Sequence, residues 1–157
     1  MRSRYEPAPA VCGIALLAVL LSSCTVIDNG PTDPFGNEPF VEGFWDIDAN
    51  VQSSTCSFVD DEQFNARIFQ NRDIIQIVVD IAGFGDIRYD GRLDDDGDFF
   101  VSHNTVFPEF GTRDDATVDG TFDFNGRTLV ATEQEILTEL ATGRQCTIVW
   151  RWFGSRR

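Results

Sequence analysis

Side chains of the kind that bind metal ions gather in one short run, DDDGD at residues 94–98. Calcium prefers several carboxylate oxygens, and a glycine permits the tight turn that brings them together. The run lacks the ligand spacing and the distal glutamate of an EF-hand loop, and Asp-Gly is also common in hairpin turns. We therefore expect a solvated turn, in which Asp94, Asp96 and Asp98 are weak candidates for a metal site.

Acid–base chemistry would have to involve His103, the only histidine of the chain. A Ser-His-Asp site needs a positioned serine, and the sequence contains no Gly-x-Ser-x-Gly elbow to supply one. Residues two positions apart on a strand share a face, so His103 would lie with Val101 and Phe107 inside a β-structure or at its rim. We therefore expect a protein that is not an enzyme and that carries no cofactor.

The cysteines divide by position into an N-terminal pair, Cys12 and Cys24, and a later pair, Cys56 and Cys146. In an oxidising compartment the later pair would most simply form a disulfide. Such a bridge closes a loop of roughly 90 residues and stabilises the fold by about 4–5 kcal/mol in the chain-entropy model. A metal site is the weaker interpretation, because the chain has one histidine and no Cys-x-x-Cys pair.

The first 23 residues have the features of a secretory signal peptide. Arg2 and Arg4 precede an apolar run at residues 11–21, and two serines follow it. The run is shorter than the roughly 20 residues that a membrane-spanning helix needs.

The end of this segment, Leu21-Ser22-Ser23-Cys24, resembles the lipobox of bacterial lipoproteins. The resemblance implies that the Cys24 thiol carries diacylglycerol and that Cys24 becomes the first residue of the mature chain. The alternative is an ordinary signal peptide that is cut near Ser23. Because Thr25 stands where an inner-membrane retention signal has Asp, we expect a lipid-anchored protein of the bacterial cell envelope, with the outer membrane favoured.

The rest of the chain divides into a tether at residues 24–39 and one folded domain at residues 40–157. Three prolines and two glycines interrupt the tether, which would span roughly 20 Å as a flexible coil. The domain is long enough for one hydrophobic core. The net charge of −14 disfavours nucleic acid as a partner.

Alternating apolar and polar residues predict that β-strands position all of these side chains. At residues 41–51 and 74–81, apolar side chains occupy every second position, which places them on one face of a strand. Further strands are predicted at residues 56–59, 64–70, 87–93, 98–107, 117–124, 127–136 and 145–153. Residues 132–135 also fit a helix-capping box, but we favour a continuing strand.

Turn signals connect these strands in chain order. Asn125-Gly126 suits a type I′ hairpin turn that would set Phe122 opposite Leu129, and residues 92–100 form another hairpin. Eight or nine closely spaced strands indicate an all-β fold. We expect an antiparallel up-and-down meander of about eight strands that closes into a barrel, with a β-sandwich as the alternative. In a closed meander a Cys56–Cys146 disulfide would join the first strand to the last.

Gly43-Phe44-Trp45, near the start of the first strand, resembles the Gly-x-Trp element of the lipocalins and the wider calycin group. The resemblance implies that Trp45 plugs the closed end of the barrel and that an arginine of the last strand packs across it. Gly43, Trp45 and Arg151 are the matching positions.

The resemblance also implies an interior cavity for a small hydrophobic ligand. An eight-stranded barrel is just wide enough to hold one small ligand or to be filled by side chains. With 14 phenylalanines the interior could be full, and the protein would then serve as a protein-interaction or envelope-assembly module.

Overall fold

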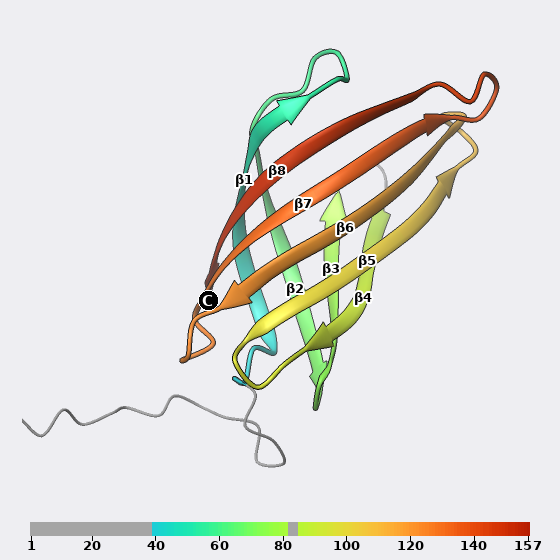
Figure 1. Ribbon diagram of the computed structural model, residues 1–157. Helices are drawn as coiled ribbons and strands as arrows, with labels where there is room; N and C mark the ends of the chain where they lie inside the picture. The colour runs from blue at the N-terminus through green and yellow to red at the C-terminus, as the bar shows by residue number, and fades with distance from the viewer. Residues whose placement is uncertain (1–38, 82–84) are drawn as a thin grey trace, which may run out of the picture.

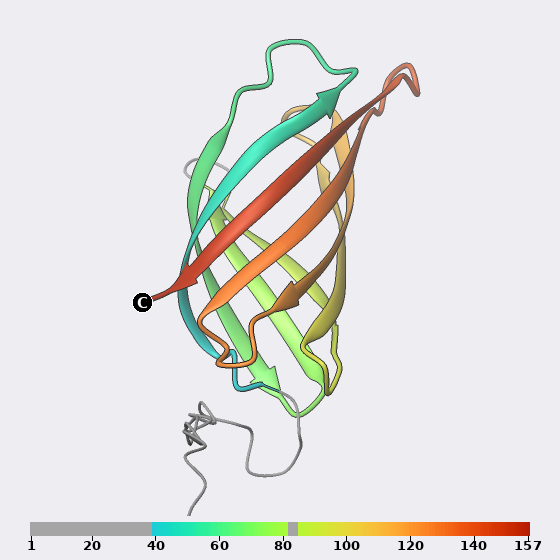
Figure 2. The same cartoon turned by 60° about the vertical axis from the view of Figure 1, so that its left-hand side comes forward.

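A computed structural model describes residues 39–81 and 85–157 of the chain. Eight antiparallel strands follow one another in chain order and close into a barrel, because β1 pairs with both β2 and β8 (Figures 1 and 2). The strands are β1 (Gly43–Ser54), β2 (Glu62–Asn71), β3 (Ile74–Ile81), β4 (Gly85–Leu93), β5 (Asp98–Phe107), β6 (Thr112–Phe122), β7 (Thr128–Glu139) and β8 (Gln145–Arg156). The predicted meander barrel is confirmed, and the sandwich alternative is wrong.

The described residues include no helix that is both long and apolar enough to cross a membrane. The predicted signal peptide, the lipobox-like segment with Cys24 and most of the predicted tether lie outside the described residues.

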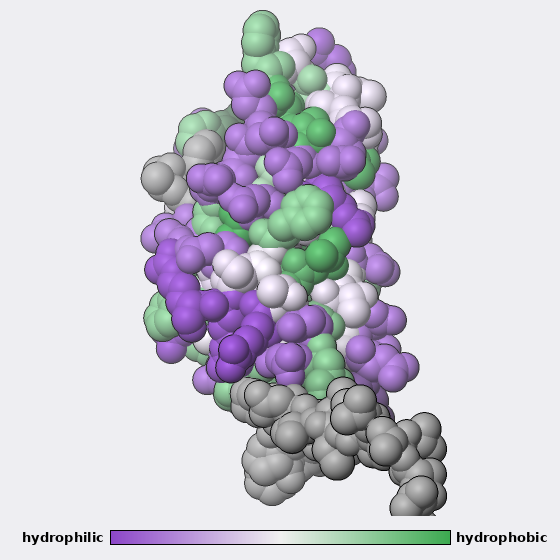
Figure 3. All heavy atoms as spheres, turned by 90° about the vertical axis from the view of Figure 1, so that its left-hand side faces the viewer, coloured by the Kyte–Doolittle hydropathy of each residue, from purple (hydrophilic) through white to green (hydrophobic). Residues whose placement is uncertain are grey.

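Side chains alternate between the interior of the barrel and solvent along each strand. On β1, Trp45, Ile47 and Ala49 are buried, whereas Asp46 and Asp48 between them are exposed. The predicted inward face of this strand is therefore confirmed. Figure 3 shows that the outer surface on one side of the barrel is largely hydrophilic, with separate hydrophobic spots.

One predicted strand does not form. Residues 56–59 are a bend in the β1–β2 connection, which leaves eight strands rather than nine. Phe58 has a φ of 61°, in the left-handed region, whereas residues of a regular strand have negative φ. By contrast, β7 runs unbroken to Glu139, so the strand predicted at residues 132–135 is confirmed over the helix-capping box.

The β6–β7 hairpin has the predicted register but a different turn. Phe122 lies opposite Leu129, as expected. The amide of Gly126 donates to the carbonyl of Asp123 at 2.8 Å, and Gly126 has a φ of 61°, whereas Asn125 is not in the positive-φ region. The carboxylate of Asp123 accepts bonds from the amides of Arg127 and Thr128, at 2.6 and 2.8 Å. A type I′ turn needs two residues with positive φ, whereas this longer loop, capped by Asp123, needs only Gly126. The longer loop therefore forms in place of the predicted turn.

Trp45 fills the end of the barrel at which the described chain begins, which we call the closed end. Its ring meets Phe122 edge-on, with 5.3 Å between the ring centroids, and its indole N–H donates to the carbonyl of Val41 at 3.0 Å. The side chain has no solvent exposure. Trp45 therefore takes the position that the lipocalin resemblance implied.

The arginine at the closed end is Arg156, so the assignment of Arg151 to this role is wrong. Arg156 lies opposite Trp45 in the β1–β8 register, and its guanidinium donates to the carbonyl of Phe40 at 2.8 Å. Its Nε lies 3.1 Å from the point where a Cβ on Gly43 would stand, so a side chain at Gly43 would crowd it. Arg151 lies five positions away along β8 and donates to the hydroxyl of Thr132 at 2.8 Å.

The opposite end of the barrel, which we call the mouth, carries the disulfide. Cys56, in the β1–β2 connection, is bonded to Cys146 on β8, so the predicted disulfide across the seam is confirmed. The amide of Thr55 donates to the carbonyl of Thr147 at 2.9 Å and continues the β1–β8 contact beside the bridge.

Candidate functional site

The interior of the barrel changes from apolar to partly polar between the closed end and the mouth. On β7, Ala131 is followed at the next inward positions by Glu133 and Glu135. Strands β5 and β6 change at a similar level, where they place His103 and Asp114 inside. Strand alternation brings these groups together, because each lies on the inward face of its own strand.

A cavity of about 370 Å³ lies in this polar half and is partly open to solvent. Its volume falls within the range of about 300–1,000 Å³ that is typical of small-molecule sites. All eight strands contribute lining side chains, and Phe58 and Asp60 of the β1–β2 connection form part of the rim. Aromatic rings contribute much of the wall, from Phe64, Tyr89, Phe107, Trp150 and Trp152.

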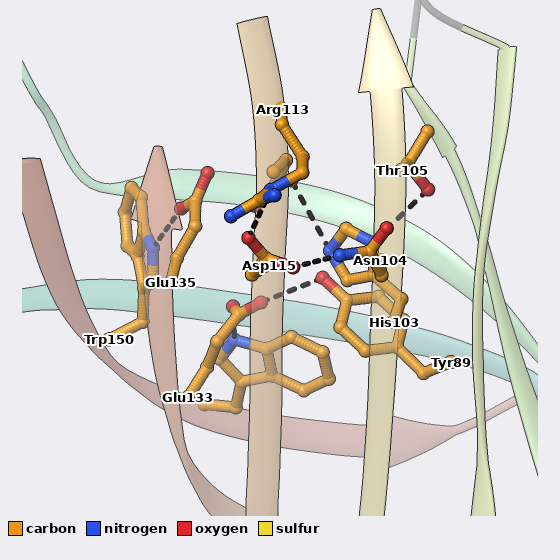
Figure 4. A network of polar contacts seen from close by, with 11 residues as sticks. Tyr89, His103, Asn104, Thr105, Arg113, Asp115, Glu133, Glu135 and Trp150 are labelled. Carbon is orange, nitrogen blue, oxygen red and sulfur yellow. Dashed lines mark hydrogen bonds and ion pairs between the residues drawn. The ribbon is translucent and has the colours of Figure 1, made fainter. Parts of the chain in front are cut away.

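Glu133 is the most enclosed carboxyl group of the cavity, with 6% of its surface exposed. It accepts hydrogen bonds from the hydroxyl of Tyr89 at 2.7 Å and from the indole N–H of Trp152 at 3.0 Å (Figure 4). Burial raises the pKa of Glu133 to about 8, because the charged form loses its hydration; the two hydrogen bonds oppose this rise only in part. Near neutral pH the Glu133 carboxyl group is therefore protonated in most protein molecules.

Glu135 repeats this arrangement one step nearer the mouth. The indole N–H of Trp150 donates to Glu135 at 2.9 Å (Figure 4). Burial, followed by the charge of Asp114, raises the pKa of Glu135 to about 7. Trp150 lies opposite Glu133 in the β7–β8 register, so each indole reaches the glutamate that is diagonal to it.

Asp114 and His103 form the third part of the cluster. The Nε2 atom of His103 lies 3.2 Å from Oδ2 of Asp114, and its Nδ1 lies 3.3 Å from the hydroxyl of Thr105. The ring of Tyr89 packs edge-on against the imidazole, with 4.5 Å between the centroids. Neither His103 Nε2 nor Asp114 Oδ1 has a hydrogen-bond partner of adequate geometry among the described residues. Asp114, which is 5% exposed and lines the cavity, thus has one buried carboxylate oxygen without a donor among the described residues.

Polar contacts on the outer wall hold β5 and β6 in register beside this cluster. The guanidinium of Arg113 donates to Asp115 at 2.7 Å, and the amide side chain of Asn104 also donates to Asp115 (Figure 4). Asp115 makes these contacts on the outer face of β6. Since neighbouring side chains of a strand alternate between its faces, Asp114 points into the barrel.

The acidic run at residues 94–98 forms the expected exposed turn between β4 and β5. One oxygen of Asp94 accepts hydrogen bonds from the amides of Asp96 and Asp98, each at 3.0 Å. The described part of the chain contains no group of three His, Cys, Asp or Glu residues that is placed to hold a metal ion.

The sequence interpretation identified His103 as an interior or rim residue, which is confirmed, but it missed Asp114, Glu133 and Glu135. The signal was present on β7: Glu133 and Glu135 continue the every-second-position series of Leu129 and Ala131. Charged residues rarely point into the interior of a barrel. The alternating pattern was therefore read as a strand, and the two glutamates were not recognised as part of a site.

Comparison with protein-family models finds no match for the chain, and comparison with curated proteins finds none either.

Proposed function

We propose that the protein is a lipocalin-like, non-enzymatic binding protein that holds a small molecule in the cavity at its mouth. One observation carries this proposal: half of the barrel is tightly filled around Trp45, whereas the other half contains a partly open cavity of about 370 Å³. A barrel that served only as a rigid support would be expected to fill both halves with side chains.

The proposal includes a lipid anchor at Cys24 in the bacterial cell envelope, with the outer membrane favoured. The described chain enters the barrel at the closed end, where Pro39 lies close to Gly97 of the β4–β5 turn. An anchor that precedes this point would leave the mouth facing away from the membrane, accessible to a ligand from the aqueous phase. Labelled fatty acid should be incorporated into the wild-type chain and not into Cys24→Ala. Equal labelling of both chains would overturn the anchor.

A binding role also agrees with the surroundings of His103. The imidazole is almost fully enclosed, with 1% of the side chain exposed, between Tyr89, Thr105 and Asp114. Both ring nitrogens face other side chains of the protein, which suits a structural histidine. An ester-hydrolysis assay in which the wild type and His103→Ala show the same rate would agree with this assignment, and loss of a measurable activity in the variant would contradict it.

Ligand uptake can be tested with the full Cys24→Ala chain, purified without detergent and examined by native mass spectrometry. We expect retention of small molecules from a panel of fatty acids, lysophospholipids and aromatic amphiphiles. Ala49→Phe should abolish retention, because Ala49 lines the cavity from β1. Thr117→Phe adds the same ring to the exposed outer face of β6 and should have no effect. Absence of uptake across the whole panel, together with absence of binding of small aromatic amines, would overturn the proposed function.

A role as a protein-interaction module remains the second candidate, and the outer wall favours it at one place. Phe44 and Phe69 are exposed there, and the guanidinium of Arg67 lies 5.3 Å and 4.4 Å from their respective ring centroids. Site-specific crosslinking from position 44 in intact envelopes should yield one defined adduct that Phe69→Ser diminishes. Crosslinking that is no stronger than from exposed Thr117 would remove this candidate.

A further inference from the structure

We infer that the cavity recognises a small organic cation, an amine joined to an apolar and preferably aromatic body, because three carboxyl groups and several aromatic rings converge on it. The inference rests on the proposed binding function and names the chemical class of the ligand. The carboxyl groups are those of Asp114, Glu133 and Glu135, which come from the adjacent strands β6 and β7.

The charge of the cavity is one-sided. Asp60 and Glu62 add two further acids near the rim, and no arginine is among the described lining residues. The basic residues of the described chain lie elsewhere; Arg113 and Arg144, for example, are paired with acids outside the cavity. Ionised acids in such a wall, next to apolar side chains, concentrate field lines and attract cations. An anionic ligand such as a fatty acid would instead meet like charge.

Asp114 supplies the observation that points most directly to a ligand. It is 5% exposed, lines the cavity and has one oxygen without a hydrogen-bond partner among the described residues. A buried acceptor without a donor costs about 1–3 kcal/mol. An ammonium group carries several N–H donors and would compensate the carboxylate of Asp114, whereas an alkyl chain would not.

The aromatic residues make the site specific for a cation with an apolar body. The indole N–H groups of Trp150 and Trp152 are already bonded to Glu135 and Glu133, so both carboxyl groups are held in fixed orientations. The rings lie beside those carboxyl groups in the cavity wall. Aromatic faces attract cations, by about 2 kcal/mol or more when the pair is shielded from water.

Protons couple to this binding. The titratable groups that face the cavity are Asp60 and Glu62 at the rim, and Tyr89, Asp114, Glu133 and Glu135 deeper inside, with His103 behind Asp114. Burial raises the pKa of Glu133 to about 8 and that of Glu135 to about 7, so both are partly protonated near neutral pH. A bound cation favours the ionised carboxylates, so it should displace protons, and its affinity should increase as the pH rises from 6 to 8.

Two matched sets of probes test the inference by isothermal titration calorimetry with the full chain. The first set is 2-phenylethylamine, 2-phenylethanol and 3-phenylpropionate; the second is tryptamine, tryptophol and indole-3-propionate. Each set keeps the ring and changes the polar end from cationic to neutral to anionic. We expect the amine to bind at least tenfold more tightly than the alcohol, and the carboxylate to bind most weakly. Titrations in buffers of different ionisation enthalpy should report proton release for the amine alone.

Variants of the cavity acids test whether these residues cause the preference for amines. Glu133→Gln and Asp114→Asn should each weaken amine binding at least tenfold and change alcohol binding little. Asp119→Asn removes the same charge from the exposed outer face of β6 and is the matched control, with no expected effect. Circular dichroism of each variant checks the fold; the two cavity variants are independent, so a failure of one to fold leaves the other as the test.

The outcomes separate the inference from the proposed function. If the alcohols or the lipid panel bind as tightly as the amines, or if both cavity variants bind the amines like the wild type, the cation inference is wrong and the binding function stands. If neither the six probes nor the lipid panel gives saturable binding, both are wrong.

Discussion

The two halves of the barrel interior are built from the same strands but differ in chemistry. At the closed end, β7 contributes Leu129 and Ala131 to an apolar core, and toward the mouth it contributes Glu133 and Glu135 to a cavity. The backbone pairing with β8 continues without interruption through both halves. Alternation along a strand thus determines which side chains enter the barrel, whereas the residue type at each inward position determines the chemistry of the interior there.

The tryptophans show the same contrast. At the closed end the indole of Trp45 bonds to a backbone carbonyl and its ring is packed against Phe122. Near the mouth, the indoles of Trp150 and Trp152 bond to glutamate side chains. One residue type thus seals the fold at one end and fixes acidic groups at the other. The closed half should therefore dominate stability, and the mouth half should govern ligand binding and pH response.

The largest expected effect tests whether the mouth half needs covalent support. Replacement of both Cys56 and Cys146 by serine removes a bridge across a sequence separation of 90 residues. The chain-entropy model predicts a loss of about 4–5 kcal/mol in the free energy of unfolding. Urea denaturation measures the loss, and hydrogen exchange should increase first near the mouth. A loss below about 1 kcal/mol would show that pairing of β1 with β8 holds the seam without the bridge.

A pair of tryptophan substitutions compares the halves directly. Trp45→Ala should lower the free energy of unfolding by about 3–5 kcal/mol, because the void left by the indole ring would be enclosed on all sides. Trp150→Ala should cost roughly half as much, since its ring already borders an open cavity. Urea denaturation of both variants checks the ratio. Equal losses would contradict the division into a packed half and a binding half.

Stability should depend on pH through the mouth half. Glu133 has a pKa of about 8 in the folded protein against an ordinary value of 4.5, so the folded chain binds more protons between these values. The free energy of unfolding should therefore fall as the pH rises across this window, by roughly a few kcal/mol, and stay lower above it. Glu133→Gln should flatten the dependence, and Glu42→Gln at the exposed closed end should not. An unchanged slope in Glu133→Gln would contradict the assignment.

The smallest expected effect concerns an acid outside the cavity. Asp123→Ala removes the acceptor for the amides of Arg127 and Thr128 in the β6–β7 turn and should cost about 1 kcal/mol. Asp95→Ala, in the neighbouring exposed turn, should change stability by less than about 0.5 kcal/mol. Thermal denaturation of both variants measures the difference. If Asp123→Ala altered amine binding as well, the functional separation of the two ends would be wrong.

The sequence predicted the barrel well because local rules determine it. Alternation located β1, and the hairpin at Asn125-Gly126 gave the correct pairing of Phe122 with Leu129. The arginine at the closed end could not be assigned in the same way. Whether Arg151 or Arg156 reaches Trp45 depends on the register between β1 and β8, which lie at opposite ends of the folded chain and include a shift between Val51 and Ser53.

The cavity was predicted as a possibility of the fold, but its acids were not. Glu133 and Glu135 lie on the same face of β7 as the core residues, yet burial of a carboxyl group is costly unless hydrogen-bond donors contact it. Those partners, Tyr89, Trp150 and Trp152, come from β4 and β8, and only the closed barrel brings them to β7. A site assembled from such distant segments has no compact sequence motif.

The pairing of β1 with β8 also has a consequence for how the protein is made. Every other pairing joins strands that are neighbours in sequence, but the β1–β8 pairing must wait for β8, whose 12 residues end at Arg156. Until then the chain is an open sheet with two unpaired edges, which can join to other chains. Contacts between such distant segments also slow folding. Because β8 follows the other seven strands in the chain, its pairing with β1 is the step that turns an aggregation-prone sheet into a closed barrel.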